Sequence, residues 1–321
     1  PLNAQIERAK DLIRTWYEHY DGKVYVSFSG GKDSTALLTL ARKVYPDIPG
    51  VFVDTGLEYP ELRSFVRQFD NIITLRPKMT FKQVCETFGY PIFGKEIAQC
   101  VQGARWYVAN DDGNENRAHL RDYQLLMGKI DKYGNVKDVV LPEDKSLYAK
   151  ENYKFMLDAD FEISARCCDV MKKSPVHTFN HQNNTYPILG TMASESKLRT
   201  YQWVKNGCNA FDSRNPSSKP LSFWTEQDAL MFLYANNIEI ASVYGDIVPD
   251  REIDDELFVR MQNLESFELD KPSFNYLRQF LHTTCYIQPI KHLDILQYGQ
   301  CGIRLLSYVP SIPEYQKSFR I

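Results

Sequence analysis

A glycine turn between a strand-like segment and a helix-like segment limits this chain to few fold classes. Residues 27–35 read Ser-Phe-Ser-Gly-Gly-Lys-Asp-Ser-Thr. They follow the apolar start of a strand predicted over Val24–Phe28 and lead into a helix predicted from about Ser34 to Val44. A strand that turns directly into a helix is the repeating unit of α/β folds. The order therefore predicts an α/β domain with this turn at the carboxyl end of a strand.

The residue types in the turn are those that bind phosphate. Gly30 and Gly31 lack Cβ, so their N–H groups can approach a ligand closely. The helix that follows adds unpaired N–H groups and a partial positive charge at its first turn. Lys32 adds a cation, and the hydroxyl residues are suited to bind phosphate or to cap the helix. We assign nucleotide binding to Ser27, Ser29, Gly30, Gly31, Lys32, Asp33, Ser34 and Thr35.

The turn differs from a Walker A loop. A Walker A loop has another glycine upstream of its Gly-Lys-Ser/Thr. Here that glycine is missing, and Asp33 follows Lys32. The alternative is an ordinary Gly-Gly turn without a ligand, but the order of strand, turn and helix favours phosphate binding.

Strands and helices alternate along much of the chain. Residues with helical spacing between Ile6 and Trp16 predict a first helix. Further strands are predicted over Gly50–Val53, Ile72–Leu75 and Tyr186–Thr191, and further helices over Pro60–Gln68, over Phe81–Phe88, from near Ser194 and after Thr225. This alternation predicts a doubly wound, mainly parallel, twisted sheet with helices on both faces. Ligands of such sheets bind at the carboxyl ends of the strands.

The chain is predicted to divide after residue 245. Residues 1–245 form the nucleotide-binding α/β domain, with an insertion over about 103–160 that contains the polar run Asn110–Asn116. After Gly245 the sequence becomes acidic, and residues 246–321 predict a mainly helical appendage.

Composition and charge narrow the class of protein. Of the 321 residues 43% are hydrophobic and 25% are charged, which is ordinary for a globular protein. The net charge of −3 disfavours nucleic-acid binding by the surface as a whole. The apolar runs are shorter than the roughly 20 residues that span a bilayer, and the amino terminus predicts a helix rather than a signal peptide. We therefore expect a cytoplasmic protein without a membrane segment.

The seven cysteines, irregularly spaced, indicate reduced thiols or a metal centre rather than disulfides. The adjacent Cys167 and Cys168 suit a metal or an iron–sulfur centre if other cysteines join them, and they are otherwise small buried apolar residues. The remaining candidates are Cys208, Cys285 and Cys301, whose spacing specifies no site.

A second polar turn follows the strand predicted over Gly50–Val53. It consists of Asp54, Thr55 and Gly56. A carboxylate at this position suits a ribose hydroxyl or Mg²⁺. Asp-Thr-Gly is also a common turn sequence, so both interpretations stay open.

A third turn follows the strand that begins at Tyr186. Gly190 and Thr191 lead toward a helix on which Glu195 and Arg199 lie four residues apart. These two residues form either a surface ion pair or a site in which the Arg199 guanidinium binds phosphate or sulfate. The position at the carboxyl edge favours binding, and all four residues are assigned to the nucleotide site.

Five segments together resemble, in order, the phosphoadenosine phosphosulfate reductase family of the PP-loop superfamily of ATP pyrophosphatases and adenine nucleotide α-hydrolases. They are Ser29–Ser34, Asp54–Gly56 with Glu58, Cys167-Cys168 with Lys172, Lys173 and Pro175, Gly190–Arg199, and Pro220–Thr225 with Tyr244-Gly245. The resemblance covers about residues 20–246. It implies adenine nucleotide binding, with cleavage or substitution at a phosphate or sulfate. It also implies that Lys32, Asp33 and Arg199 are catalytic, that the nucleotide is ATP or phosphoadenosine phosphosulfate, and that Mg²⁺ accompanies it.

The chain departs from this family toward its carboxyl end. Family reductases carry Glu-Cys-Gly-Leu/Ile-His, whose cysteine attacks sulfur, whereas this chain has Gln300-Cys301-Gly302-Ile303-Arg304. It also contains no Cys-x-x-Cys pair, so an iron–sulfur cluster is not expected.

Three functions follow, in order of preference. The first is an ATP pyrophosphatase that adenylates an acceptor in sulfur-transfer metabolism. The second is a thiol-dependent reductase of phosphoadenosine phosphosulfate or adenosine phosphosulfate, in which Cys301 attacks sulfur. The third is a nucleotide-binding partner protein without catalysis. The resemblance implies a sulfur-carrier or thioredoxin-like protein partner, and it allows a nucleic-acid acceptor and a homodimer.

Overall fold

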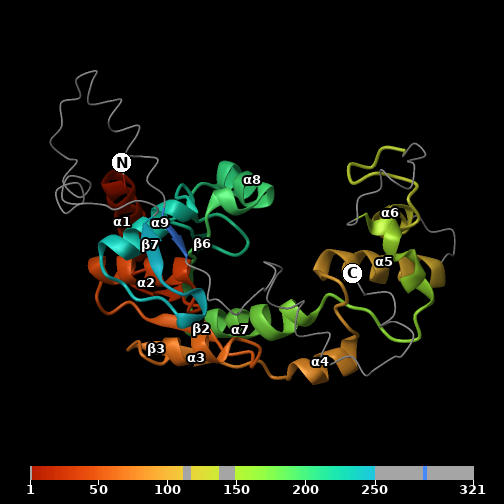
Figure 1. Cartoon of the computed structure of the whole chain (residues 1–321), viewed down its shortest axis with the longest axis horizontal. Helices are drawn as coiled ribbons and strands as arrows, with labels where there is room; N and C mark the ends of the chain where they lie inside the picture. The colour runs from red at the N-terminus through yellow and green to blue at the C-terminus, as the bar shows by residue number, and fades with distance from the viewer. Residues whose placement is uncertain (1, 111–116, 137–148, 250–284, 288–321) are drawn as a thin grey trace, which may run out of the picture. The chain divides into compact units, whose positions relative to one another are not determined.

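The computed structural model describes residues 2–110, 117–136, 149–249 and 285–287. These residues form two compact units. The first contains residues 2–54, 58–76, 176–249 and 285–287, and the second contains residues 55–57, 77–110, 117–136 and 149–175. Figure 1 shows the order of the helices and strands along the chain.

A six-stranded sheet forms the centre of the first unit. Its strands are β1 (Val24–Ser27), β2 (Gly50–Val53), β3 (Ile72–Leu75), β4 (Tyr186–Ile188), β5 (Asn209–Ala210) and β6 (Ser217–Ser218). Their order is β3-β2-β1-β4-β6-β5, and neighbouring strands are parallel except β5 with β6. The chain adds β2 and β3 on one side of β1 and later adds β4 on the other side. The strand order therefore reverses between β1 and β4, which is where open α/β sheets bind ligands.

Helices cover both faces of this sheet. One buried cluster contains Val24 and Val26 of β1 together with residues from four helices. These helices are α1 (Leu2–His19), α2 (Lys32–Val44), α3 (Pro60–Val66) and α9 (Glu226–Ala235). Tyr25, between them, points to the opposite face because side chains alternate along a strand. Its hydroxyl donates to Asn180 Oδ1 at 2.8 Å, in α7 (Ser174–Asn183). Figure 1 shows α9 beside α2, in agreement with their contact. The predicted doubly wound α/β fold is confirmed.

Several predicted boundaries shift, mostly where a capping residue decides the end of an element. α2 begins at Lys32 rather than near Ser34, because Gly31 has the extended backbone of an N-cap. The helix predicted from near Ser194 is α8 (Lys197–Asn206), because the Ser196 side chain caps it by accepting from the Arg199 N–H at 3.3 Å. Ala193–Glu195 form the short 3-10 turn η4 instead. β1, β4 and α3 end slightly before their predicted limits.

The second unit is helical in its described part. It contains α4 (Phe81–Phe88), α5 (Lys95–Ala109), α6 (Arg117–Leu126), the 3-10 helix η2 (Lys150–Asp158) and the π-helical turn η3 (Asp169–Lys173). Ala104, Leu126 and Met156 belong to a buried cluster that joins α5, α6 and η2. The insertion predicted over about 103–160 thus contributes helices with a small core of their own. Residues 111–116 and 137–148 lie outside the described residues.

Little of the predicted carboxyl-terminal appendage is described. β7 (Ile247–Pro249) pairs antiparallel with β8 (Cys285–Ile287). Residues 250–284 and 288–321 lie outside the described residues, so the division after residue 245 stays a prediction. None of the helices in the described part is long and apolar enough to cross a membrane.

Candidate functional site

The predicted phosphate-binding turn joins β1 to α2. Gly30 has a φ of +76°, in the left-handed region that favours glycine. A Cβ at Gly30 would lie 2.8 Å from Val66 Cγ2, so the turn packs directly on α3. Conformation and packing both require glycine at this position.

Hydroxyl groups hold the turn together. Ser34 Oγ donates to the Gly31 carbonyl at 2.9 Å and accepts from the Ser29 N–H at 3.2 Å. Thr35 Oγ1 donates to the same carbonyl at 3.0 Å, and Ser29 Oγ lies 3.1 Å from Ser34 Oγ. Ser34 and Thr35 are therefore engaged within the turn. The first N–H groups of α2 have no acceptor within the helix, and they are the donors that an anion would use.

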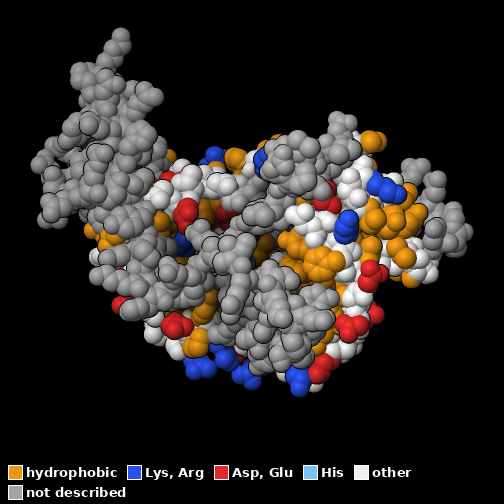
Figure 2. Space-filling view, turned by 45° about the vertical axis from the view of Figure 1, so that its right-hand side comes forward, with side chains coloured by type: hydrophobic (Ala, Val, Ile, Leu, Met, Phe, Trp, Pro, Cys, Tyr) orange, Lys and Arg blue, Asp and Glu red, His pale blue; other side chains and the backbone are white. Residues whose placement is uncertain are grey.

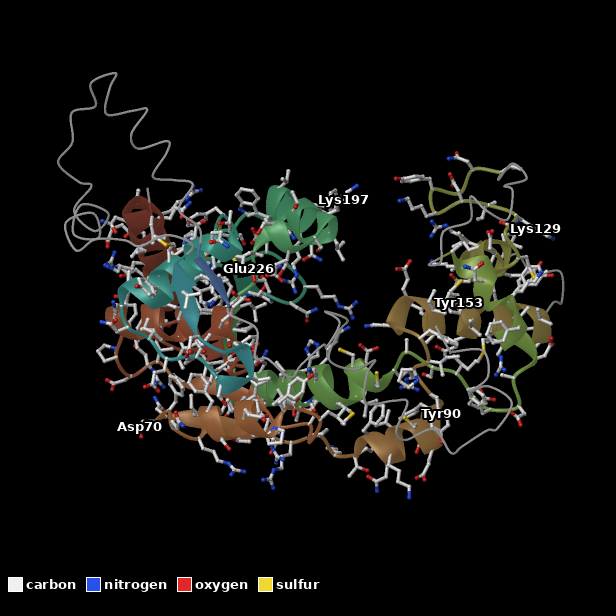
Figure 3. The ribbon with its side chains drawn as sticks, in the orientation of Figure 1. Asp70, Tyr90, Lys129, Tyr153, Lys197 and Glu226 are labelled. Carbon is white, nitrogen blue, oxygen red and sulfur yellow. The ribbon has the colours of Figure 1, made fainter. Side chains whose placement is uncertain are left out.

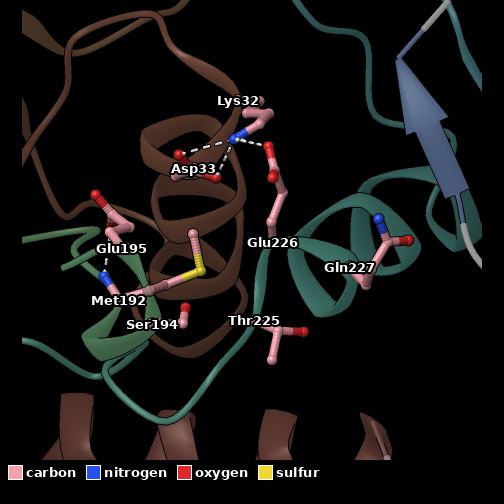
Figure 4. A pocket seen from close by; sticks show the side chains of 8 residues that line it. All are labelled: Lys32, Asp33, Met192, Ser194, Glu195, Thr225, Glu226 and Gln227. Atoms are coloured by element: carbon pink, nitrogen blue, oxygen red, sulfur yellow. Dashed lines mark hydrogen bonds and ion pairs between the residues drawn. The ribbon is translucent and has the colours of Figure 1, made fainter. Parts of the chain in front are cut away.

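Lys32 lies between two carboxylates (Figure 4). Its Nζ donates to Asp33 Oδ1 at 3.0 Å and Oδ2 at 3.1 Å, and it lies 3.1 Å from Glu226 Oε1. Burial by itself lowers the pKa of the Lys32 ammonium, but its charge interactions and hydrogen bonds with Asp33 and Glu226 raise that pKa above its ordinary value. Lys32 is therefore a cation at neutral pH.

A pocket of about 410 Å³ lies beside Lys32. It is lined by the start of α2, the segment after β4 and the start of α9. The lining residues are Lys32, Asp33, Met192, Ser194, Glu195, Thr225, Glu226 and Gln227. Gly190 brings the first two segments together, since a Cβ there would lie 3.1 Å from the Asp33 carbonyl oxygen. The pocket thus lies where the strand order reverses, and its volume suits a small molecule.

The segment after β4 places Glu195 in the pocket lining. Glu195 Oε1 accepts from the Met192 N–H at 2.8 Å, and Oε2 forms an ion pair with Arg199 Nη1. The ion pair, one of the two interpretations of the Glu195–Arg199 spacing, is therefore present. Contact between Arg199 and a phosphate or sulfate stays a prediction, as do roles for Gly190 and Thr191 in nucleotide binding.

Sequence analysis did not identify Lys219, which follows β6 at the same edge of the sheet. Its Nζ donates to Gln202 Oε1 of α8 at 3.4 Å. Burial, and to a smaller extent the positive charge of Arg199, lower the pKa of Lys219. The only indication of Lys219 in the sequence is its position directly after Ser217–Ser218. That strand is too short and polar to be recognised from sequence.

Glu226 was also missed, because its place beside Lys32 results from the packing of α9 on α2. Figure 3 labels Glu226, the first residue of α9. Tyr244, part of the fifth family-like segment, lies over the turn: its Oη would be 3.2 Å from a Cβ at Gly31. Burial raises the pKa of Tyr244, although the Lys32 charge acts in the opposite direction.

Asp54 follows the last residue of β2, as predicted, and its side chain is buried. Its Oδ2 lies 2.9 Å from Arg63 Nη2 and 3.9 Å from Arg76 Nε. The carboxylate is thus held by arginines, and its contact with a ribose or Mg²⁺ stays a prediction. Thr55 and Gly56 belong to the second unit, where the φ of Gly56 is +78° and Thr55 Oγ1 accepts from the Leu57 N–H at 3.2 Å. These features are those of a turn.

The carboxylates that line the pocket are the possible ligands of the predicted Mg²⁺. Mg²⁺ commonly binds one or two carboxylates together with substrate phosphates. Asp33, Glu195 and Glu226 line the pocket, but each is already paired with Lys32 or Arg199. Within the described residues, no group of three or more His, Cys, Asp or Glu side chains is arranged to hold a metal ion. We therefore assign no chemical step to Mg²⁺.

The cysteines within the described residues are free thiols, namely Cys85, Cys100, Cys167, Cys168 and Cys208. Burial raises the pKa of both Cys85 and Cys100 to about 11. Cys301 and the side chain of Cys285 lie outside the described residues.

The described surface carries charges of both signs. On the face shown in Figure 2, basic and acidic side chains are interspersed among the described residues. This mixture agrees with the net charge of −3. The nucleic-acid acceptor stays a prediction.

Comparison with known proteins identifies relatives of the turn-containing region. Residues 23–99 match the family model described as "Phosphoadenosine phosphosulfate reductase domain". The chain is 27% identical over 108 residues to phosphoadenosine 5′-phosphosulfate reductase of Proteus mirabilis (33% of this chain, 44% of the relative). It is 27% identical over 106 residues to adenosine 5′-phosphosulfate reductase of Bacillus velezensis (31% of this chain, 46% of the relative).

Two further matches extend this comparison. An uncharacterized protein of Methanocaldococcus jannaschii is 37% identical over 93 residues, which is 26% of this chain and 22% of that protein. The crystal structure of a phosphoadenylyl-sulfate reductase from Candida auris, in complex with phosphate, aligns with a TM-score of 0.40 at 11% identity, over 73% of this chain and 82% of that one. The chain spans less than half the length of these three curated relatives. The family resemblance predicted from sequence is confirmed for the matched region, residues 23–99, which includes the Gly30–Gly31 turn.

Proposed function

We propose that this chain, whose residues 23–99 match the phosphoadenosine phosphosulfate reductase domain, is a member of that family and that it binds a sulfonucleotide and cleaves it at its phosphosulfate group. The observation that carries the proposal is the position of the Gly30–Gly31 turn. It lies where the strand order of the sheet reverses, and its Lys32 lines a pocket of about 410 Å³.

Binding would use the start of α2. The N–H groups of its first turn and the Lys32 ammonium are donors for one anionic group of the nucleotide. The hydrogen bonds of Ser34 and Thr35 to the Gly31 carbonyl hold these donors in place. No movement of the backbone is then needed for an anion to meet them.

Cleavage of a phosphosulfate leaves negative charge on the departing nucleotide phosphate. Lys32 and the N–H groups are fixed before the reaction and would stabilise this charge as it develops. The eight lining residues include no cysteine and no histidine, so an attacking thiol would come from another segment of the chain or from a second molecule. The chain's own contribution is therefore binding, orientation and charge stabilisation.

Thiol-dependent reduction is the more specific form of this proposal. A thiolate sulfur attacks the sulfate sulfur, the S–O bond to the nucleotide phosphate breaks, and the sulfonate is left bonded to the thiol sulfur. A second thiol then attacks that thiol sulfur, so that a disulfide forms and sulfite leaves; the two thiols are oxidised and the sulfur of the sulfate is reduced. The names of the relatives from Proteus mirabilis and Bacillus velezensis support it. Cys301 is the candidate thiol. Cys85 and Cys100 are poor candidates, because a thiol with a pKa of about 11 is almost wholly protonated at neutral pH.

ATP pyrophosphatase activity is the second candidate. The same donors suit the phosphates of ATP, and the segment around Cys301 lacks the Glu and His of the family reductases. This reaction would release AMP and pyrophosphate, either directly or after adenylation of an acceptor.

A nucleotide binding and product screen tests these proposals. The full chain is incubated with ATP, adenosine phosphosulfate or phosphoadenosine phosphosulfate, in the presence and absence of a thiol reductant and Mg²⁺. Sulfite release that is lost in Cys301→Ser indicates the reductase, and AMP with pyrophosphate indicates the pyrophosphatase. Binding of a nucleotide without any product would leave only a non-catalytic partner protein. If no nucleotide binds, the proposed function is wrong.

A matched pair of lysine variants tests the site itself. Lys32→Met removes the ammonium and keeps the apolar stem, and we expect nucleotide affinity to fall by about 10- to 100-fold, as for loss of a charged hydrogen bond. Lys205→Met changes an exposed lysine of α8 and should leave affinity unchanged. Equal effects of the two substitutions would exclude Lys32 from the site.

A further inference from the structure

More carboxylates than cations line the pocket beside Lys32. Its eight lining residues include one cation, Lys32, and three carboxylates, those of Asp33, Glu195 and Glu226. Two of these carboxylates contact the Lys32 ammonium directly, at 3.0 Å and 3.1 Å. Glu195 is compensated by Arg199, but an anion that binds Lys32 meets an ammonium already paired with two carboxylates, those of Asp33 and Glu226.

The two carboxylates on Lys32 are held differently. Asp33 is the next residue of the same helical turn, so it moves with Lys32. Glu226 belongs to α9, and its side chain is 63% exposed whereas that of Lys32 is 13% exposed. The Glu226 backbone is fixed, because Thr225 and Asp228 form a capping box at the start of α9. The Glu226 side chain is thus free to turn aside, but it cannot leave the neighbourhood of the pocket.

We propose that Glu226 is a specificity-determining residue of the site, which disfavours ligands that bring a dianionic terminal phosphate to Lys32 relative to ligands that bring a monoanionic terminal sulfate. The inference rests on the proposed nucleotide site and names the substrate class that the site selects. Any ligand anion must displace Glu226 from Lys32. After displacement the carboxylate remains close, and its repulsion acts once on a sulfate ester and twice on a terminal phosphate.

Two nucleotides of nearly the same shape allow a dianionic and a monoanionic terminal group to be compared. ADP and adenosine 5′-phosphosulfate differ in the terminal group, which is phosphate in one and sulfate in the other. A phosphate of this kind has a second pKa near 6, so at about pH 8 it is a dianion, whereas the sulfate carries one charge. One extra charge at roughly 5 Å from an exposed carboxylate corresponds to about a fivefold change in affinity.

The experiment measures the dissociation constants of both nucleotides by calorimetry, without divalent cations, for the full chain and for Glu226→Gln. We expect E226Q to tighten adenosine 5′-phosphosulfate binding by about fivefold and ADP binding by about 25-fold, so that the ratio of the two affinities changes about fivefold. Glu226→Asp, which keeps the charge, should retain the discrimination. The difference should also shrink at high salt.

Glu239→Gln is the matched control, because it removes one carboxylate from an exposed position of the same unit. An equal effect of E239Q would show that net charge, rather than Glu226, sets the ratio. An unchanged ratio in E226Q, with both nucleotides still bound, would overturn the inference and leave the proposed function intact. Failure of both nucleotides to bind any variant would overturn both.

Discussion

In the phosphate-binding turn, Gly30 is the position at which an added methyl group should lower stability most. Its φ of +76° strains any other residue by about 1 kcal/mol. The new Cβ of Gly30→Ala would lie 2.8 Å from Val66 Cγ2, so Val66 or α3 must move. Overpacking of this kind costs about 1–3 kcal/mol. We expect G30A to lower the free energy of unfolding by about 2–4 kcal/mol in total.

A variant at Gly207 distinguishes the conformational cost of the substitution from the cost of overpacking. Its φ is +70°, but a Cβ there would meet nothing within 4 Å. Gly207→Ala should therefore show only a conformational part, which is about 1–3 kcal/mol because a φ of +70° with a ψ of −164° is almost exclusive to glycine. The assay is urea unfolding followed by tryptophan fluorescence, since Trp16 and Trp224 are buried in the core of the same unit. A loss of no more than about 1 kcal/mol in G30A would refute the packing argument, and no loss in G30A would refute the conformation of the turn.

Three further outcomes are expected. Ser34→Ala should lower the free energy of unfolding by about 1–2 kcal/mol, because it removes a hydroxyl that both donates and accepts within the turn. Arg105→Met should lower the free energy of unfolding by about 2–4 kcal/mol, because the Arg105 guanidinium donates to three backbone carbonyls. Arg121 is exposed and donates to one backbone carbonyl, so Arg121→Met should lower the free energy of unfolding by less than about 1 kcal/mol. Burial raises the pKa of the Cys85 and Cys100 thiols to about 11 from an ordinary 9.0, so the stabilisation linked to these protons is complete below pH 9.0 and falls as the pH rises toward 11.

Each of these outcomes has a direct check. Urea unfolding measures the free energies of the Ser34 and arginine variants. Limited proteolysis identifies which segment of each variant unfolds first. For the thiols, alkylation by iodoacetamide at pH 8 should be slow at both sites in the folded protein and fast in urea. Rapid alkylation without urea, or wild-type stability in Arg105→Met, would contradict the burial and the contacts from which these expectations come.

Local sequence order was sufficient for the fold class and for the phosphate-binding turn. Both depend on neighbours in the chain: a buried strand, two glycines, a lysine and the first turn of a helix act through the backbone that they share. The helix that Thr225 caps was predictable for the same reason, because the cap contacts residues three positions away. Element ends were less accurate, since a single cap such as Ser196 moves a helix start.

Contacts between distant segments required the tertiary structure. Glu226 reaches Lys32 across 194 positions of sequence, and only the packing of α9 on α2 brings the two together. The Arg63 contact of Asp54 and the position of Lys219 beside α8 likewise depend on how helices lie on the sheet. Sequence by itself thus determined that a nucleotide-binding turn ends the first strand. The tertiary structure decided which charges surround its lysine, because Coulomb interactions depend on distance in space and not on separation along the chain.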